Sequence, residues 1–299
     1  MVVSLDNDLP GLQQFLERNG VARYYGEHDF PSNAERLGVG LTDGALFDFV
    51  EARLAALQSS PDPFFLASLT AGTHHPFAVP TDHPDVKALQ RESDQYIASL
   101  RYFDLTFERF FSRLQTKGLL RNTMVIILGD HGRHEPIGKT DIERQAGHFL
   151  APLYVWLDDS LRKEGNYRPR VVTQVASQVD IAPTILSING LTPRVAPFVG
   201  RNFACLLKND CLDDNRAYLS SVYDDLIGLA DQSGLWLYSF RRSSLTAVDL
   251  DLRNPASHPA GDEPKAAKHV RTMTAWYLAF NTLLEANKVW SWSDLGEKL

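Results

Sequence analysis

The sequence predicts an α/β fold in which helices flank a wound, mostly parallel sheet, with a small antiparallel sheet near the C-terminus. Continuous apolar runs at residues 64–69 and 123–128 are typical of strands buried on both faces of a parallel sheet. Helical patterns lie between these runs, which is the order of a wound sheet. Beyond Gly200 the pattern changes to short β-like runs separated by turn residues, which favours an antiparallel sheet.

The composition limits the classes of partner. The 299 residues are 44% hydrophobic, which is enough for a sizeable core in one large domain or two modest ones. The formal net charge is −7 and no run of Lys or Arg forms a basic stripe, so a nucleic-acid partner is disfavoured. Because an acidic surface repels anions at long range, a site for an anionic substrate needs local positive charge or a metal ion.

Targeting signals are absent from the sequence as written. Its first residues lack the cationic region and apolar core of a signal peptide, and no apolar stretch approaches the roughly 20 residues of a membrane-spanning helix. We therefore expect a soluble chain without an export address. Cys205 and Cys211 could pair in an oxidising compartment, but two cysteines are too few to assign one.

The first quarter of the chain predicts a helix, a short strand and a second helix. Apolar residues at helical spacing over 9–16 are followed by a stop at Asn19-Gly20 and a β-like run at 21–25. A polar cluster that contains His28 comes after this run. The second helix is expected from Thr42 to Leu57, with one apolar face.

The apolar run at 64–69 leads into a pair of adjacent histidines. His74 and His75 lie just past the end of this predicted strand, where open α/β sheets place ligands. The alternative is a pair of solvated loop histidines. A long amphipathic helix then follows from Asp85 to Gly118, and its aromatic stripe is typical of core packing.

The run at 123–128 ends on Gly129 and two polar side chains, Asp130 and His131. An adjacent Asp and His offer a hard oxygen and an imidazole nitrogen, which a turn can direct at one divalent cation. Alternatively, Asp130 caps the next segment and His131 is a surface loop residue. From the pair alone, the second interpretation is favoured.

The remaining elements complete the prediction. We expect a strand at 151–157, a helix from 179 to 188 with Asp180 as its N-cap, and a final helix from 270 to 284. Between the last two helices, β-like runs lie at 218–222, 234–239 and 244–250, and an exposed loop is predicted at 251–265. The predicted organisation is a core at residues 1–200 and a β-rich subdomain at 201–299, packed on the same core.

Taken together, these motifs resemble a known family. The chain is similar to the sulfatase and phosphoglycerol transferase branch of the alkaline phosphatase superfamily, and most similar to lipoteichoic acid synthases. The resemblance covers roughly residues 8–285, and the joint order of its motifs is more specific than any one of them. The motifs are His74-His75-Pro76-Phe77, the helix that ends at Gly118, Thr123 to Gly132, Ala151-Pro152-Leu153, Asp180-Ile181-Ala182-Pro183-Thr184, Gly190-Leu191, Val248-Asp249-Leu250 and Asn254-Pro255.

The resemblance implies an alkaline phosphatase-like fold and a set of site residues. It implies that Asp130 and His131 help to hold a divalent metal ion, which is Mn, Ca, Mg or Zn. Similar enzymes contact the transferred group with a histidine that corresponds to His74. His75 is a weaker candidate for substrate binding, and the resemblance places His28 or Tyr25 loosely at a further polar contact with the substrate. The implied substrate is a sulfate or phosphate ester, lipid- or glycan-linked in some relatives.

One part of the family pattern is not found in this sequence. Family members carry an acidic metal ligand and a Thr, Ser or modified Cys nucleophile upstream of the segment that matches residues 8–30, so the catalytic nucleophile is not assigned. Two interpretations follow: a truncated metal-dependent hydrolase or transferase that is inactive by itself, or a catalytically silent sulfatase-like binding module. Relatives are usually membrane-associated and act outside the cytoplasm, although this chain has no membrane-spanning segment.

Overall fold

A computed structural model describes most of the chain. The described residues form two compact units, Met1–Arg121 and Asn122–Leu299, and each unit is treated by itself. The predicted boundary between a core at residues 1–200 and a β-rich subdomain at 201–299 is a separate division, and it stays a prediction. The described residues are 1–5, 11–80, 94–132, 139–191, 200–208, 216–221, 225–251, 256–259 and 264–286.

Unit 1 contains a short parallel pair of strands. β1 (Val2–Val3) pairs in parallel with β4 (Ser68–Leu69), and both residues of β1 are fully buried. The strand predicted at 21–25 is wrong in extent, because only Tyr25 forms a bridge, to Val2. β2 (Arg36–Leu37) and β3 (Gly40–Leu41) form a small hairpin.

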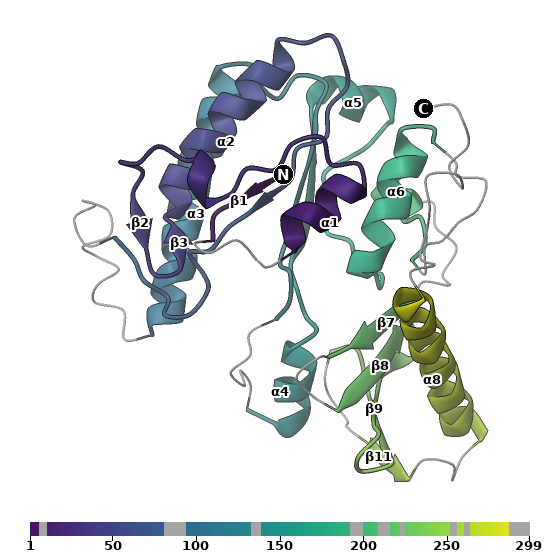
Figure 1. Cartoon of the computed structure of the whole chain (residues 1–299). Coiled ribbons are helices and arrows are strands. Elements are labelled where there is room, and N and C mark those ends of the chain that lie inside the picture. The colour runs from purple at the N-terminus through teal and green to yellow at the C-terminus, as the bar shows by residue number, and fades with distance from the viewer. Residues whose placement is uncertain are drawn as a thin grey trace. The chain divides into compact units, whose positions relative to one another are not determined.

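Two long helices of unit 1 lie side by side (Figure 1). α2 (Asp43–Gln58) begins after Thr42, whose Oγ1 accepts the Ala45 N–H at 3.3 Å, and α3 (Gln95–Thr116) confirms the described part of the helix predicted from residue 85. Phe47 of α2 stacks on Phe110 of α3 with ring centroids 4.6 Å apart, so the aromatic stripe is core packing. The shorter elements are α1 (Leu12–Arg18) and a 3-10 turn, η1 (Glu27–Asp29).

Unit 2 begins with an antiparallel strand pair. β5 (Met124–Leu128) pairs with β6 (Leu153–Leu157), with Ile126 opposite Val155. The expectation that this apolar run is a strand is confirmed. Its described neighbour is antiparallel, however, and its side chains are half-buried or exposed, whereas the run predicted burial on both faces.

Several short helices follow in unit 2. α6 (Ile181–Ile188) confirms the predicted helix, preceded by a 3-10 turn, η3 (Gln178–Asp180). Asp180 is its N-cap residue, as predicted, but the Asp180 side chain makes no capping hydrogen bond to the helix. α4 (Asp141–Gly147) was not predicted from the sequence, and the side-chain contacts of Thr140 and Glu143 with the backbone stabilise its start. The other helices here are α5 (Asp159–Glu164) and α7 (Ala204–Lys208).

The predicted C-terminal antiparallel sheet is present, and it contains two more strands than the sequence predicted. Its order is β11-β10-β9-β8-β7, and α8 (Pro264–Glu285) packs along β7 and β8 (Figure 1). β8 was missed, and β11 lies inside the loop predicted at 251–265. Leu245 and Met273 are fully buried between sheet and helix. The strands are β7 (Ala217–Ser220), β8 (Leu226–Asp231), β9 (Gly234–Ser239), β10 (Ser244–Val248) and β11 (Ala256–Pro259).

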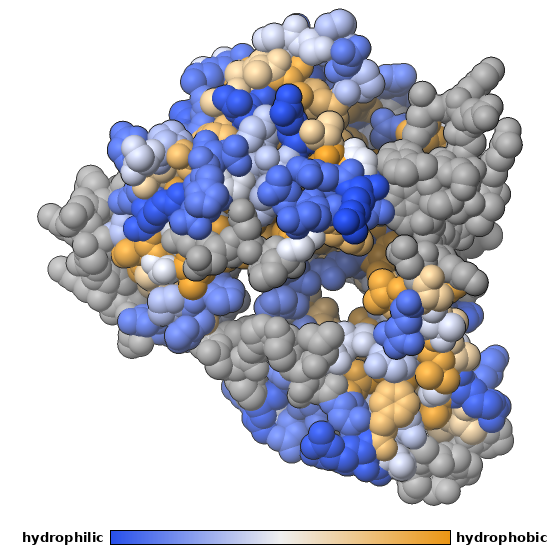
Figure 2. Space-filling model, viewed as in Figure 1, coloured by the Kyte–Doolittle hydropathy of each residue, from blue (hydrophilic) through white to orange (hydrophobic). Residues whose placement is uncertain are grey.

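Apolar residues also reach the surface of α8. Figure 2 shows orange residues over this helix, and Leu278, Leu283 and Leu284 are exposed there. Within the described residues, however, no helix combines the length and the apolar character needed to cross a membrane.

Candidate functional site

Asp130 and His131 form a turn directly after β5 in unit 2. The Asp130 Oδ1 accepts the backbone N–H of His131 at 2.9 Å, and Asp130 Oδ2 lies 3.5 Å from His131 Nε2. Both side chains are accessible, with 70% of the Asp130 side chain and 48% of the His131 side chain exposed. The two residues predicted as metal ligands therefore place a carboxylate oxygen and an imidazole nitrogen close together on solvent-exposed side chains.

The backbone around this pair is held at several points. Gly129 N–H donates to the Pro152 carbonyl at 3.1 Å, and Gly132 N–H donates to the His148 carbonyl at 3.1 Å. A Cβ on Gly132 would lie 1.8 Å from the Gly147 carbonyl oxygen, so the close approach of these two segments requires glycine. The turn is thus fixed against the segment that joins α4 to β6.

The chemistry of this pair fits a divalent cation. Two donors each about 2.1 Å from one ion, at a tetrahedral angle, lie about 3.4 Å apart, and the observed Oδ2–Nε2 separation is 3.5 Å. Among the described residues, no group of three or more His, Cys, Asp and Glu side chains accompanies the pair. His134, which follows the pair in the sequence, lies outside the described residues.

His74 and His75 lie in a loop of unit 1 after β4, as predicted. The loop turns through two backbone hydrogen bonds, His74 N–H to the Ala71 carbonyl at 3.0 Å and Phe77 N–H to the His74 carbonyl at 2.8 Å. His74 Nδ1 lies 2.7 Å from the His75 carbonyl oxygen. Because a carbonyl only accepts, Nδ1 carries the proton, and Nε2 is the other ring nitrogen of an exposed imidazole.

His28, the third predicted substrate contact, lies in η1 and is exposed. The Gly26 N–H donates to the Asp29 carboxylate at 2.9 Å and fixes this short turn. His28 therefore lies on a different element of unit 1 from the His74 loop.

Asp43 is a buried carboxyl that the sequence did not single out. It is fully buried at the first turn of α2, its Oδ1 accepts the Gly72 N–H at 3.2 Å, and its Oδ2 has no hydrogen-bond partner. Burial raises the pKa of Asp43 to about 6, although the Gly72 hydrogen bond opposes this shift. Gly72 precedes His74 by two residues, so Asp43 anchors the histidine loop.

A second backbone anchor, also missed, lies in unit 2. The side-chain amide of Gln178 in η3 donates to the carbonyls of Gly129 and Asp130. Gln178 stands in the sequence just before the Asp180 motif, but nothing in its spacing predicts a contact with a turn 48 residues earlier. Only the tertiary fold reveals it.

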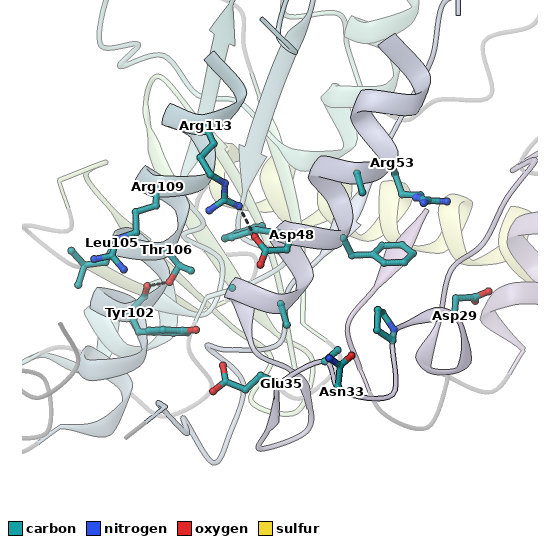
Figure 3. Close-up of a pocket in the computed structure, with 17 residues that line it drawn as sticks. Asp29, Asn33, Glu35, Asp48, Arg53, Tyr102, Leu105, Thr106, Arg109 and Arg113 are labelled. Carbon is teal, nitrogen blue, oxygen red and sulfur yellow. Dashed lines mark hydrogen bonds and ion pairs between the residues drawn. The ribbon is translucent and has the colours of Figure 1, made fainter. Parts of the chain in front are cut away.

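A cavity of about 710 Å³ lies in unit 1 next to α2 and α3 (Figure 3). None of the predicted site residues lines it. Arg113 points at Asp48 across part of it and forms an ion pair at 2.6 Å, and Arg113 also pairs with Glu51. The cavity therefore contains none of the predicted metal ligands or substrate contacts.

The comparison with protein families gives an extended match. A sequence model of the sulfatase family matches residues 6–191. Among curated proteins, a lipoteichoic acid synthase-like protein of Bacillus subtilis is 24% identical over 188 residues, covering 58% of this chain and 29% of that protein. A lipoteichoic acid synthase of Staphylococcus saprophyticus is 28% identical over 210 residues, covering 66% of this chain and 31% of the relative. The chain thus spans less than a third of the length of these relatives.

Solved structures share the fold. A protein of the alkaline phosphatase superfamily from Vibrio parahaemolyticus superposes with a TM-score of 0.75 at 19% identity, covering 97% of this chain and 66% of that one. A lipoteichoic acid synthase from Listeria monocytogenes gives a TM-score of 0.67 at 15% identity, covering 94% of this chain and 69% of that one. These neighbours confirm the predicted alkaline phosphatase-like α/β fold with its small antiparallel sheet.

Proposed function

Because this chain belongs to the sulfatase family, we propose that it is a metal-dependent domain that hydrolyses or transfers sulfate or phosphate esters. The observation that carries this proposal is the Asp130–His131 turn, where a carboxylate oxygen and an imidazole nitrogen lie 3.5 Å apart and exposed. The family match supports the class of substrate, and the geometry of the turn supports the metal.

Asp130 Oδ2 and His131 Nε2 are the proposed ligands. A divalent cation bound there would polarise an oxygen of the transferred group and lower the pKa of a nucleophilic hydroxyl. A mixed carboxylate and imidazole pair suits Mn²⁺, Zn²⁺, Mg²⁺ and Ca²⁺ to different degrees, so each of these ions is a probe. The negative charge of Asp130 also offsets part of the charge of the cation.

His74 is the proposed contact with the transferred group. Its Nδ1–H donates to the His75 carbonyl, so this hydrogen bond fixes the ring and leaves Nε2 to meet a sulfate or phosphate oxygen. In the imidazolium form, Nε2–H donates to that anionic oxygen. His75 and His28 are proposed as weaker substrate contacts.

The substrate is proposed to be a lipid- or glycan-linked phosphate ester or a sulfate ester, handled outside the cytoplasm or at a membrane. Support comes from the relatives that are named lipoteichoic acid synthases.

A catalytically silent sulfatase-like binding module is the second candidate. It is favoured by the small donor set, since the described residues contain no group of three or more possible metal ligands. Such a module would bind a metal ion or an anion at Asp130 and His131 without turnover.

Turnover measurements separate the two candidates. The proposed enzyme needs a nucleophile from upstream of this sequence, so the test uses a version of the chain extended with upstream sequence. In that version we expect metal-dependent cleavage of an aryl phosphodiester or an aryl sulfate that is lost in Asp130→Ala and His131→Ala and retained in Asp104→Ala, an exposed position on α3. Metal-dependent binding of inorganic phosphate or sulfate without cleavage would support the binding module instead. Cleavage that survives both ligand substitutions would contradict the assigned ligands.

A further inference from the structure

The Asp180 motif has a structural link to the proposed metal ligands through Gln178. The Gln178 Nε2 donates to the Asp130 carbonyl at 2.8 Å and to the neighbouring Gly129 carbonyl. A side-chain amide has two N–H groups, so these two contacts use the full donor capacity of Gln178. The side chain thereby bridges two consecutive peptide groups.

These two peptide groups lie on either side of the Asp130 Cα. Because their orientations define the backbone dihedrals of Asp130, they also set the direction in which its carboxylate leaves the chain. The same side chain therefore constrains the distance between Asp130 Oδ2 and His131 Nε2. The Gly129 and Gly132 amide hydrogen bonds hold the turn, but they do not contact the Asp130 carbonyl.

Gln178 is itself held in place by Asp180. The carboxylate of Asp180 is buried, and its two oxygens accept the backbone N–H groups of Ser177 at 2.8 Å and Arg201 at 2.7 Å. Thr184 Oγ1 donates to the Asp180 carbonyl and accepts the Phe203 N–H at 2.8 Å. Asp180 and Thr184 thus fix η3 and the start of α6 against the segment 201–203, and Gln178 projects from this fixed point.

We propose that Gln178 is a positioning residue that fixes the Asp130–His131 turn in the geometry that binds a divalent cation. This inference rests on the proposed function, because it assigns Gln178 a role at the same metal site. Gln178 touches neither the proposed cation nor the substrate and acts through the backbone of Asp130. Asp180 acts one step further away by anchoring η3.

Gln178→Met tests this role because methionine has a similar length and lacks the two N–H donors. We expect the affinity for Mn²⁺, measured by calorimetry, to fall about tenfold, as for other groups that orient metal ligands. The amide hydrogens of Gly129 and Gly132, followed by NMR, should exchange faster with solvent even without metal. Gln174→Met, four residues earlier, is the matched control, because the Gln174 side-chain oxygen accepts a hydrogen bond from Arg170 at 3.5 Å, and it should change neither quantity.

The outcomes separate this inference from the proposed function. Unchanged Mn²⁺ affinity and unchanged amide exchange in Gln178→Met would overturn the role of Gln178 while the metal site stands. If the wild-type chain binds none of the four cations, the metal site is wrong, and Gln178 is not a positioning residue for it. A lower unfolding midpoint in Gln178→Met with wild-type Mn²⁺ affinity would show a purely structural role and would also overturn the inference.

Discussion

Asp43 shows how one buried side chain connects a helix to the histidine loop. Its carboxyl lies against the backbone of Gly72, where an added Cβ would come within 2.2 Å of Oδ2. A fully buried carboxylate with only one backbone donor is costly to ionise, which is why burial raises its pKa to about 6. The protonated form is therefore the more stable one in the fold below this pH.

The substitution Asp43→Asn should stabilise the protein at alkaline pH. The folded-state pKa of Asp43 is about 6 and its ordinary value is 3.8. The contribution of the protonated Asp43 carboxyl to the free energy of unfolding is therefore fully present below about pH 4 and is lost as the pH rises through 6. Asparagine does not ionise and avoids this loss, so the free energy of unfolding should rise by about 3 kcal/mol at pH 8 and not change at pH 3.5. Urea unfolding at both pH values measures it.

The matched control for Asp43→Asn is Asp104→Asn, an exposed aspartate on α3. Because the Asp104 side chain is exposed, this substitution removes no buried carboxyl, and no comparable gain is expected. A gain in Asp43→Asn that is equal at pH 3.5 and pH 8 would contradict the ionisation of a buried carboxyl.

At the residue scale, the sequence predicts adjacent functional groups better than distant ones. Asp130 and His131 were predictable because they are neighbours that follow an apolar run, and the structure places their side chains together. Asp43 and Gln178 were not, because their partners Gly72 and Asp130 lie 29 and 48 residues away. Backbone hydrogen bonds of this kind leave no pattern in residue type or spacing.

At the scale of elements, long amphipathic helices were predicted well and short strands poorly. Thr42 was expected at the start of α2, and it caps that helix. β8 was missed because Gly228 interrupts its apolar pattern, and the glycine is there since a Cβ would lie 2.9 Å from Leu237. β5 was expected in a parallel sheet, but its described neighbour, β6, is antiparallel, because an apolar run does not encode the direction of the strand that pairs with it.

The pairing of α2 with α3 depends in part on an ion-pair network around Glu51. The Glu51 side chain is 12% exposed. It pairs with Arg113 of α3 and with Lys117, the C-cap residue of that helix. The hydrogen bond from Lys117, followed by that from Arg113, lowers the pKa of Glu51. We expect Glu51→Gln to reduce the free energy of unfolding by about 1 kcal/mol at pH 7.

The pH and salt dependence of Glu51→Gln identifies the cause. Since the pKa of Glu51 is lowered in the fold, its contribution is present above its ordinary value of 4.5 and is lost as the pH falls through the folded-state pKa. The difference from wild type in urea unfolding should therefore shrink at pH 3 and in 1 M NaCl. A difference that is equal under all three conditions would indicate lost packing instead.

The turn after β5 should not tolerate a side chain at Gly132. A Cβ there would lie 1.8 Å from the Gly147 carbonyl oxygen, so Gly132→Ala must displace one segment from the other. We expect a loss of about 2 kcal/mol in the free energy of unfolding and weaker Mn²⁺ binding. Gly129→Ala is the milder comparison, since its nearest atom would be Pro152 Cδ at 3.2 Å. Equal effects of both substitutions would contradict this steric argument.

For the whole molecule, the fold class and the family were predictable from the order of the motifs. The sulfatase match over residues 6–191 and the alkaline phosphatase-superfamily neighbours confirm both. No single motif carried this result, since the Asp130–His131 pair alone favours an ordinary loop. The net charge of −7 adds a consequence for function, because an anionic ester then needs local positive charge at its site.

Metal titration tests most directly the proposal that Asp130 and His131 of this chain bind a divalent cation. Mn²⁺, Zn²⁺, Mg²⁺ and Ca²⁺ are each titrated by calorimetry into the wild-type chain, Asp130→Ala, His131→Ala and the control Asp104→Ala. We predict that at least one ion binds the wild type and the control, and that each ligand substitution lowers its affinity about tenfold or more. Binding of no ion by the wild type would contradict this proposal. Wild-type affinity in Asp130→Ala and His131→Ala would also contradict it.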